Sequence, residues 1–190
     1  MALGEYLKTC ARHTPGNQSL ILFEANEVDT LTVATSAVTD LDLNSGKTAL
    51  YAEFDIDGLK RTEEGVTTKG GLFYVTQKLE IHISKSSLAL YNFVKGLADQ
   101  SVCGIGAIVV DANGLKWLMG TQLDSATAAV VQGLYMTASN FDSGMARGED
   151  DMDKFTITLE RVVDNYSIPI SGAIQAATAG VITTTIIHSS

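Results

Sequence analysis

Apolar and polar residues alternate with a period of two along several stretches of the chain. The pattern is clearest in residues 50–57 and again in residues 73–83. A period of two places successive side chains on opposite faces of a β-strand, so each stretch predicts a strand with one buried face. We expect further strands where apolar runs or the same alternation recur, at residues 20–24, 31–33, 105–110, 115–119, 130–139 and 155–163.

One stretch has the spacing of a helix. Apolar residues recur every three positions from Leu88 to Leu97, and the pattern ends near Asp99. A serine just before it, Ser86 or Ser87, can cap the first turn. We therefore expect a single packed helix among the strands.

The clearest hairpin joins residues 105–110 to residues 115–119. Between them, Asn113-Gly114 supplies the positive φ angles that a tight turn requires. In contrast, the polar residues 58–71 have no periodicity that would form a core. We expect a long loop there, and loops of this length in a compact domain are usually functional or disordered.

Many strands and one helix predict a mainly β fold. We expect a β-sandwich or barrel of two packed antiparallel sheets, with one flanking α-helix and an extended terminal arm. The domain organisation that follows is an N-terminal arm at residues 1–17, a β domain at residues 18–165 and an uncharged extension at residues 166–190.

The C-terminal extension is unusual for a chain end. Tyr166 to Ser190 contain no Asp, Glu, Lys or Arg and are rich in Ile, Val, Thr and Ala. Exposed uncharged chain with this β propensity is prone to associate with other strands. We expect a neighbouring subunit to cover it, which favours an assembly protein over a freely diffusing enzyme.

Composition narrows the function further. The net charge of −9 and the pI near 4.7 argue against tight nucleic-acid binding, which needs clustered Lys and Arg. The first residues lack the apolar core of a signal peptide, and no run approaches the roughly 18 apolar residues of a membrane span. We expect a protein that folds in a cytoplasm, with Cys10 and Cys103 as buried free thiols.

The residues that carry out catalysis or bind metals do not converge. His13, His82 and His188 are scattered without ligand spacing, and His82 falls on the polar side of its strand. No nucleophile elbow, P-loop or Cys-x-x-Cys motif is present. The acidic residues 149–153 lack the spacing of a calcium loop and are interpreted as a solvated turn. The sequence therefore favours a protein that is not an enzyme and has no cofactor or metal.

Carboxylates do form a row. Two acidic residues share one face of the stretch before the turn at residues 44–47, and three share one face of the stretch after it. If the two stretches pair as a hairpin, like charges face one another, which is destabilising and suggests a use for negative potential. The row consists of Asp40, Asp42, Glu53, Asp55 and Asp57.

The order of these elements resembles that of the tail tube proteins of long-tailed bacteriophages. The shared pattern is a run of strands, a long polar loop, a single helix and then a hairpin of the form V-V-D-x-N-G-x-x-W-L-x-G, here residues 109–120. It continues with Ser143-Gly144-Met145-Ala146, Asp153 and Thr156-Ile157-Thr158-Leu159. The resemblance covers roughly residues 18–163 and leaves the C-terminal extension outside the pattern.

The resemblance implies a hexameric ring that stacks into a tube and conducts DNA without binding it specifically, as in the related tube of type VI secretion. The implied partners are further copies of the chain and the tail terminator, tape measure and baseplate proteins, with no membrane. The protein would be made in the host cytoplasm and reside in the virion. The acidic row would line the lumen, because carboxylates repel phosphates. Contacts between subunits would involve Arg61, Glu63, Glu64, Lys69, Ile182, Ile186 and Ile187.

Two other classes remain open from the sequence. One is a different virion component, such as a neck or terminator ring or a capsid decoration protein, which would bind a non-identical partner. The other is a β-sandwich binding module or an enzyme of unrecognised type.

Overall fold

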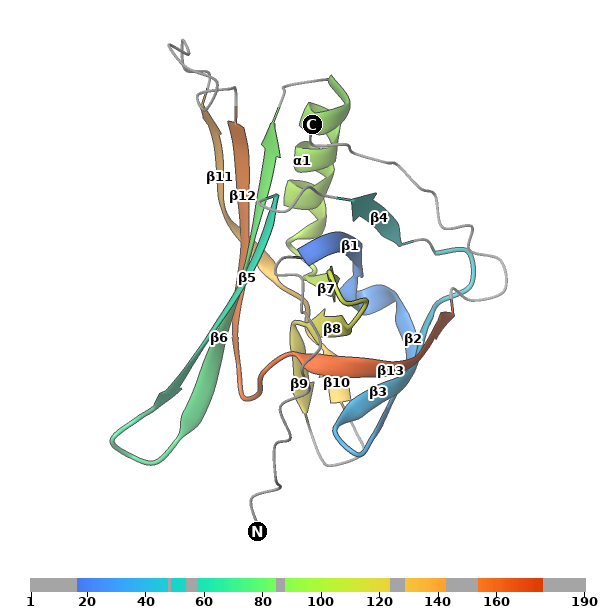
Figure 1. Cartoon of the computed structure of the whole chain (residues 1–190), viewed down its shortest axis with the longest axis vertical. Helices are drawn as coiled ribbons and strands as arrows, with labels where there is room; N and C mark the ends of the chain where they lie inside the picture. The colour runs from blue at the N-terminus through green and yellow to red at the C-terminus, as the bar shows by residue number, and fades with distance from the viewer. Residues whose placement is uncertain are drawn as a thin grey trace.

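The computed structural model describes residues 17–47, 49–53, 58–84, 88–123, 129–142 and 154–175, and the fold below is that of these residues. They form a seven-stranded sheet A in the order β2-β3-β13-β8-β7-β1-β4, a four-stranded sheet B in the order β11-β12-β6-β5, and a two-stranded sheet of β9 and β10. Figure 1 shows sheet B as one long layer on the left, with sheet A and α1 beside it.

The elements have the following bounds. Sheet A contains β1 (Asn17–Glu24), β2 (Val28–Ala34), β3 (Ala37–Leu43), β4 (Leu50–Glu53), β7 (Ile105–Asp111), β8 (Lys116–Met119) and β13 (Ile168–Gln175). Sheet B contains β5 (Leu59–Thr67), β6 (Phe73–Ser84), β11 (Tyr135–Asp142) and β12 (Lys154–Val163). The remaining elements are β9 (Thr121–Leu123), β10 (Ala129–Val131), the helix α1 (Leu88–Gln100) and the 3-10 turn η1 (Ala25–Glu27).

The middle of sheet A is buried on both faces. In β7, every residue from Ile105 to Val109 is buried. Ala107 and Val109 join a core that includes the inner face of sheet B and α1, whereas Ile108, between them, joins a second core under β2 and β3. Because successive strand residues point to opposite faces, one strand supplies both cores. Sheet A is the wall between them.

Most of the expected elements are confirmed. The fold is mainly β, with packed sheets and a single helix within the described residues, as the sequence predicts. The hairpin of β7 and β8, the alternating strand β6 and the helix α1 all lie where their patterns place them. The two sheets are antiparallel except at β13, which runs parallel to β3. The stretch expected as one strand at residues 130–139 is divided into β10 and β11 around Gly133, which has φ +71°.

The long loop expected at residues 58–71 is wrong. Residues Leu59 to Thr67 form β5, which pairs with β6 along its whole length, and a tight turn at Thr68–Leu72 joins the two strands. β5 carries no apolar alternation because Arg61 and Glu63 occupy inward-facing positions and contact polar groups (below). Figure 1 shows the tip of this hairpin extending past the rest of the described chain at the lower left.

The C-terminal extension also begins differently from expectation. Ile168 to Gln175 form β13, which lies between β3 and β8 in sheet A. Ile168 is buried in the second core, so the cover for this part of the extension is the chain's own sheet and not a neighbouring subunit. The described part of the extension therefore belongs to the β domain, while residues 176–190 and the N-terminal arm before Asn17 lie outside the described residues.

Three glycines lie where three segments of the backbone pack directly against one another. Gly104, Gly120 and Gly133 all have positive φ, a conformation that only glycine adopts at little cost. A Cβ on Gly133 would lie 2.5 Å from the carbonyl carbon of Gly104, and one on Gly120 would lie 2.8 Å from Gly133. Paired hydrogen bonds between Ile105 and Leu134, at 2.7 and 2.8 Å, close the junction. Main chains from β7, the β8–β9 link and the β10–β11 link thus pack directly on one another.

This close approach predicts a large effect of one methyl group. We expect Gly133→Ala to lower the free energy of unfolding by about 3–5 kcal/mol, because left-handed strain adds to a backbone clash. The matched control is Gly46→Ala, which has φ +82° and open space around its Cβ, and should cost only about 1–2 kcal/mol. Urea denaturation of both variants measures the difference, and equal losses would contradict the close packing.

Candidate assembly surface and its anchoring network

Sheet B has one face covered and one face bare. On β6, every second residue from Val75 to Ile83 is buried, whereas the residues between them are half-buried. The strand register carries this alternation across β5 and β12, so one face of sheet B packs on the core and the other is uncovered within the described chain. The residues of the uncovered face are mostly polar, although Thr158 among them is buried: Lys60, Thr62, Glu64, Val66, Tyr74, Thr76, Lys78, Glu80, His82, Thr156, Thr158, Glu160 and Val162.

The charges on this face are organised around Glu80. Its carboxylate lies 2.7 Å from the amine of Lys78 and 3.4 Å from that of Lys60. The hydrogen bond from Lys78 lowers the pKa of Glu80 and raises the pKa of Lys78. Beside this group, Nδ1 of His82 lies 3.2 Å from the hydroxyl of Thr156, as expected for a histidine on the polar side of its strand.

Both edges of sheet B are unpaired among the described residues. β5 ends the sheet on one side and β11 ends it on the other. β11, β12, β6 and β5 are successively antiparallel, so β5 and β11 run in opposite directions. Open strand edges can pair with another chain, and this sheet offers two of complementary direction.

On the covered face, the apolar core ends in a polar row. Gln77 pairs in register with Arg161 on one side and Glu63 on the other, one step beyond the buried pair Leu79 and Leu159. Gln77 is fully buried, and Arg161 and Glu63 are half-buried. Buried polar groups require hydrogen-bond partners, and each of these three side chains finds one on a different segment.

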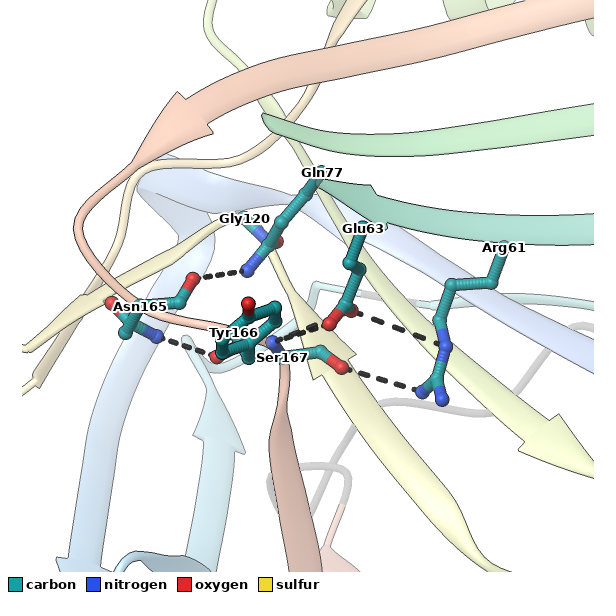
Figure 2. A network of polar contacts seen from close by, with 7 residues as sticks. All are labelled: Arg61, Glu63, Gln77, Gly120, Asn165, Tyr166 and Ser167. Atoms are coloured by element: carbon teal, nitrogen blue, oxygen red, sulfur yellow. Dashed lines mark hydrogen bonds and ion pairs between the residues drawn. The ribbon is translucent and has the colours of Figure 1, made fainter. Parts of the chain in front are cut away.

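Gln77 joins three parts of the chain (Figure 2). Its amide nitrogen donates to the carbonyl of Asn165 at 2.9 Å, and its amide oxygen accepts from the backbone N–H of Gly120 at 2.7 Å. The Asn165 side chain in turn accepts from the N–H of Leu123 at 3.2 Å and donates to the carbonyl of Tyr166 at 2.7 Å. The turn between β12 and β13 is thereby fastened to β6 and to the link before β9.

Arg61 and Glu63 hold the start of β13 from the other side (Figure 2). Arg61 donates to the Ser167 hydroxyl at 3.3 Å, and the Ser167 N–H lies 3.4 Å from both carboxylate oxygens of Glu63. The guanidinium of Arg61 stacks 4.6 Å from the ring centre of Trp117, a cation–π geometry. Burial lowers the pKa of Arg61, and the charges of Glu63 and Asp111 oppose that shift.

An aromatic contact extends the same attachment along the hairpin. The rings of Tyr166 and Phe73 lie 5.9 Å apart, and the Tyr166 hydroxyl occupies the space where a Cβ on Gly65 would lie. Tyr166, in the turn between β12 and β13, therefore contacts both strands of the β5–β6 hairpin. On the opposite side of the row, Arg161 donates to the carbonyls of Gln132 and Gly133 at 2.7 and 3.1 Å, and stacks on Tyr135.

The acidic row is not assembled as expected. Asp40 and Asp42 do share the half-buried side of β3, opposite the buried Leu41. However, β3 pairs with β2 and β13, whereas Glu53 is on β4, which pairs with β1 at the other edge of sheet A. The expected hairpin is therefore wrong, and β3, which carries Asp40 and Asp42, lies away from sheet B (Figure 1). Asp55 and Asp57 lie outside the described residues.

The inter-subunit candidates fall into three groups. Arg61 and Glu63 make the contacts within the chain given above, while Glu64 and Lys69 are exposed on the hairpin. Ile182, Ile186 and Ile187 lie outside the described residues, as do Cys10, His13 and His188. Cys103 is exposed, so its expected burial is wrong; it follows the last turn of α1, where the chain turns at the surface.

Sequence reasoning missed Gln77, Glu80, Asn165 and Arg161. The available signal was weak: a Gln on the apolar face of the alternation in β6 marks the point where the core ends.

No metal site is found among the described residues, since no three His, Cys, Asp or Glu side chains gather there. The helix α1 is too short to cross a bilayer. No protein-family model matches the chain, and no curated protein matches it.

The buried position of Gln77 predicts a specific loss of stability. Gln77→Leu leaves the Gly120 N–H and the Asn165 carbonyl without their partner, so we expect about 2–4 kcal/mol lower stability. Thr76→Val, on the uncovered face of the same strand, should change stability by less than about 0.5 kcal/mol. Urea denaturation compares the two variants, and a Gln77→Leu protein as stable as the parent would contradict the anchoring role.

The ion pairs of Glu80 predict a change in its titration. Because the pair lowers the pKa, its contribution to stability is present above the ordinary carboxyl pKa and is lost as the pH falls through the lowered value. Lys78→Gln should move the pKa of Glu80 upward, although Lys60 remains. NMR titration of the Glu80 carboxyl carbon measures this, with Lys95→Gln on α1 as the control that should leave the midpoint unchanged.

Proposed function

We propose that this chain is a structural subunit that assembles into rings, and that the rings stack into a tube of the kind found in long bacteriophage tails. One observation carries the proposal. Sheet B has two unpaired edges of opposite direction, so β5 of one copy can continue the antiparallel ladder from β11 of the next. Repeating one such contact around an axis closes a ring and removes both edges.

The uncovered face of sheet B is the face that would line the channel. Its other face is already occupied by sheet A and α1, which form the outer layer of such a ring. Among the side chains described on the uncovered face, Glu64, Glu80 and Glu160 outnumber Lys60 and Lys78, while Asp142 and Lys154, paired at the end of the register, add one charge of each sign. Excess carboxylate disfavours retention of a polyanion. Screening over about 8 Å at physiological salt limits this repulsion to molecules near the wall. DNA that passes through without specific binding is the cargo that fits.

Stacking would use the β5–β6 hairpin. Its tip projects beyond the rest of the described chain, and Leu72 is 74% exposed there, next to the exposed Phe73 (Figure 1). Contacts between one ring and the next are heterologous, so they propagate as a filament. The uncharged residues Ile182, Ile186 and Ile187 are proposed as further contacts between copies. The remaining partners would be the terminator, tape measure and baseplate proteins of a virion tail.

Negative-stain electron microscopy of the purified protein over a range of concentrations tests the proposal. We expect rings or hollow filaments. Ser139→Lys with Asn140→Lys places two charges on the exposed edge of β11 and should abolish assembly while the chain stays folded, because charged edges resist pairing.

The matched control is Ala98→Lys with Val102→Lys, which adds the same charge at exposed positions near the end of α1. Circular dichroism establishes folding of both variants. A parent protein that stays monomeric at every concentration, or an edge variant that assembles as well as the control, would overturn the proposal.

A further inference from the structure

One carboxylate on the uncovered face of sheet B engages two lysines, Lys60 and Lys78. Glu80 is two residues after Lys78 on β6, and in the strand register it lies opposite Lys60 on β5. Its two oxygens are divided between them, with Oε1 2.7 Å from Lys78 and Oε2 3.4 Å from Lys60. Glu160 lies opposite Lys78 on β12 and adds a second negative charge beside it.

Glu64, on the same face, has no such arrangement. Glu64 is exposed on β5, and no ion pair joins it to a described lysine or arginine. Glu64 and Glu80 therefore contribute equally to the net charge of the face, but only Glu80 is paired with lysines. Removing Glu80 would take away the ion pairs of two amines whose side chains are 67% and 37% exposed and would leave only Glu160 beside Lys78, whereas removing Glu64 would take away none.

An unpaired lysine amine strengthens the binding of a polyanion more than a small change in the net charge of the face does. Each Lys that contacts a phosphate releases counterions and adds affinity that depends on salt. Lysines already paired with a carboxylate must break that contact first. A face that carries lysines can thus avoid holding nucleic acid if each of them is engaged by a neighbour.

We propose that Glu80 is a masking residue, which holds Lys60 and Lys78 so that the uncovered face of sheet B does not retain nucleic acid. The role rests on the proposed channel for its biological use, but the masking itself is a property of the face. Masking by Glu80 would thus add to the repulsion from the excess carboxylates, because it keeps Lys60 and Lys78 from contacting phosphates.

The test compares Glu80→Gln with Glu64→Gln, two isosteric changes that each remove one negative charge from the same face. Binding of a short labelled duplex DNA is measured by fluorescence anisotropy over a range of salt concentrations. If Lys60 and Lys78 each gain a phosphate contact, a fourfold rise in salt should weaken binding about tenfold more in Glu80→Gln than in Glu64→Gln. Adding Lys60→Gln and Lys78→Gln to Glu80→Gln should return binding to the level of the control.

The outcomes separate masking from the proposed tube. Equal binding by the two single variants, or no binding by either at low salt, overturns the masking role even if electron microscopy shows rings. Stronger binding by Glu80→Gln alone, reversed in the triple variant, supports masking, and it does so even if the protein remains monomeric. In that last case the proposed channel is wrong, whereas the masking role of Glu80 is supported.

Discussion

The structure depends on the burial of β7 on both faces. Ala107 and Val109 point into the core shared with sheet B, while Ile108 points into the core beneath β2 and β3. A strand with two apolar faces must be covered on both sides, since either face left in water would cost the free energy gained by burial. Sheet B and α1 provide one cover, and the β2–β3 end of sheet A provides the other. The far face of sheet B therefore remains uncovered within the described chain.

Where the apolar core ends, polar side chains take over the connection between layers. Gln77 and Asn165 fasten the β12–β13 turn, and Glu63 and Tyr166 bring the same turn against the β5–β6 hairpin. Hydrogen bonds of this kind have direction, so they fix position in a way that apolar contacts do not. The consequence is that the projecting hairpin and the last described strand are placed by one set of contacts. A partner that moves the hairpin would also act on β13.

The proposed assembly uses the edges and the face of sheet B that the rest of the described chain leaves uncovered. Within the described chain, sheet B has open edges on both sides and an uncovered face on which Glu80 engages Lys60 and Lys78. Edge pairing would supply cohesion between copies, and the masked charges would keep the shared face from retaining a polyanion. In the proposed assembly, the backbone at the edges of sheet B would hold the copies together, and the side chains on its face would keep a polyanion from binding.

The sequence by itself determined the elements whose signal is local. The alternation in β6 and β12, the three-residue spacing of α1 and the tight turn of the β7–β8 hairpin each report on their own segment, and all are found. Of the pair Asn113-Gly114, however, only Gly114 has the expected positive φ. Only the tertiary structure decided that polar β5 is a strand, that β13 lies between β3 and β8, and that β3 and β4 lie far apart in sheet A. The same holds for the candidate site. The polarity of residues 58–71 was evident from the sequence, but the contacts made by Gln77 and Glu80 were not. The physical reason is that a hydrophobic period records whether a residue meets core or water, whereas strand order and polar anchoring depend on which distant segment supplies the partner.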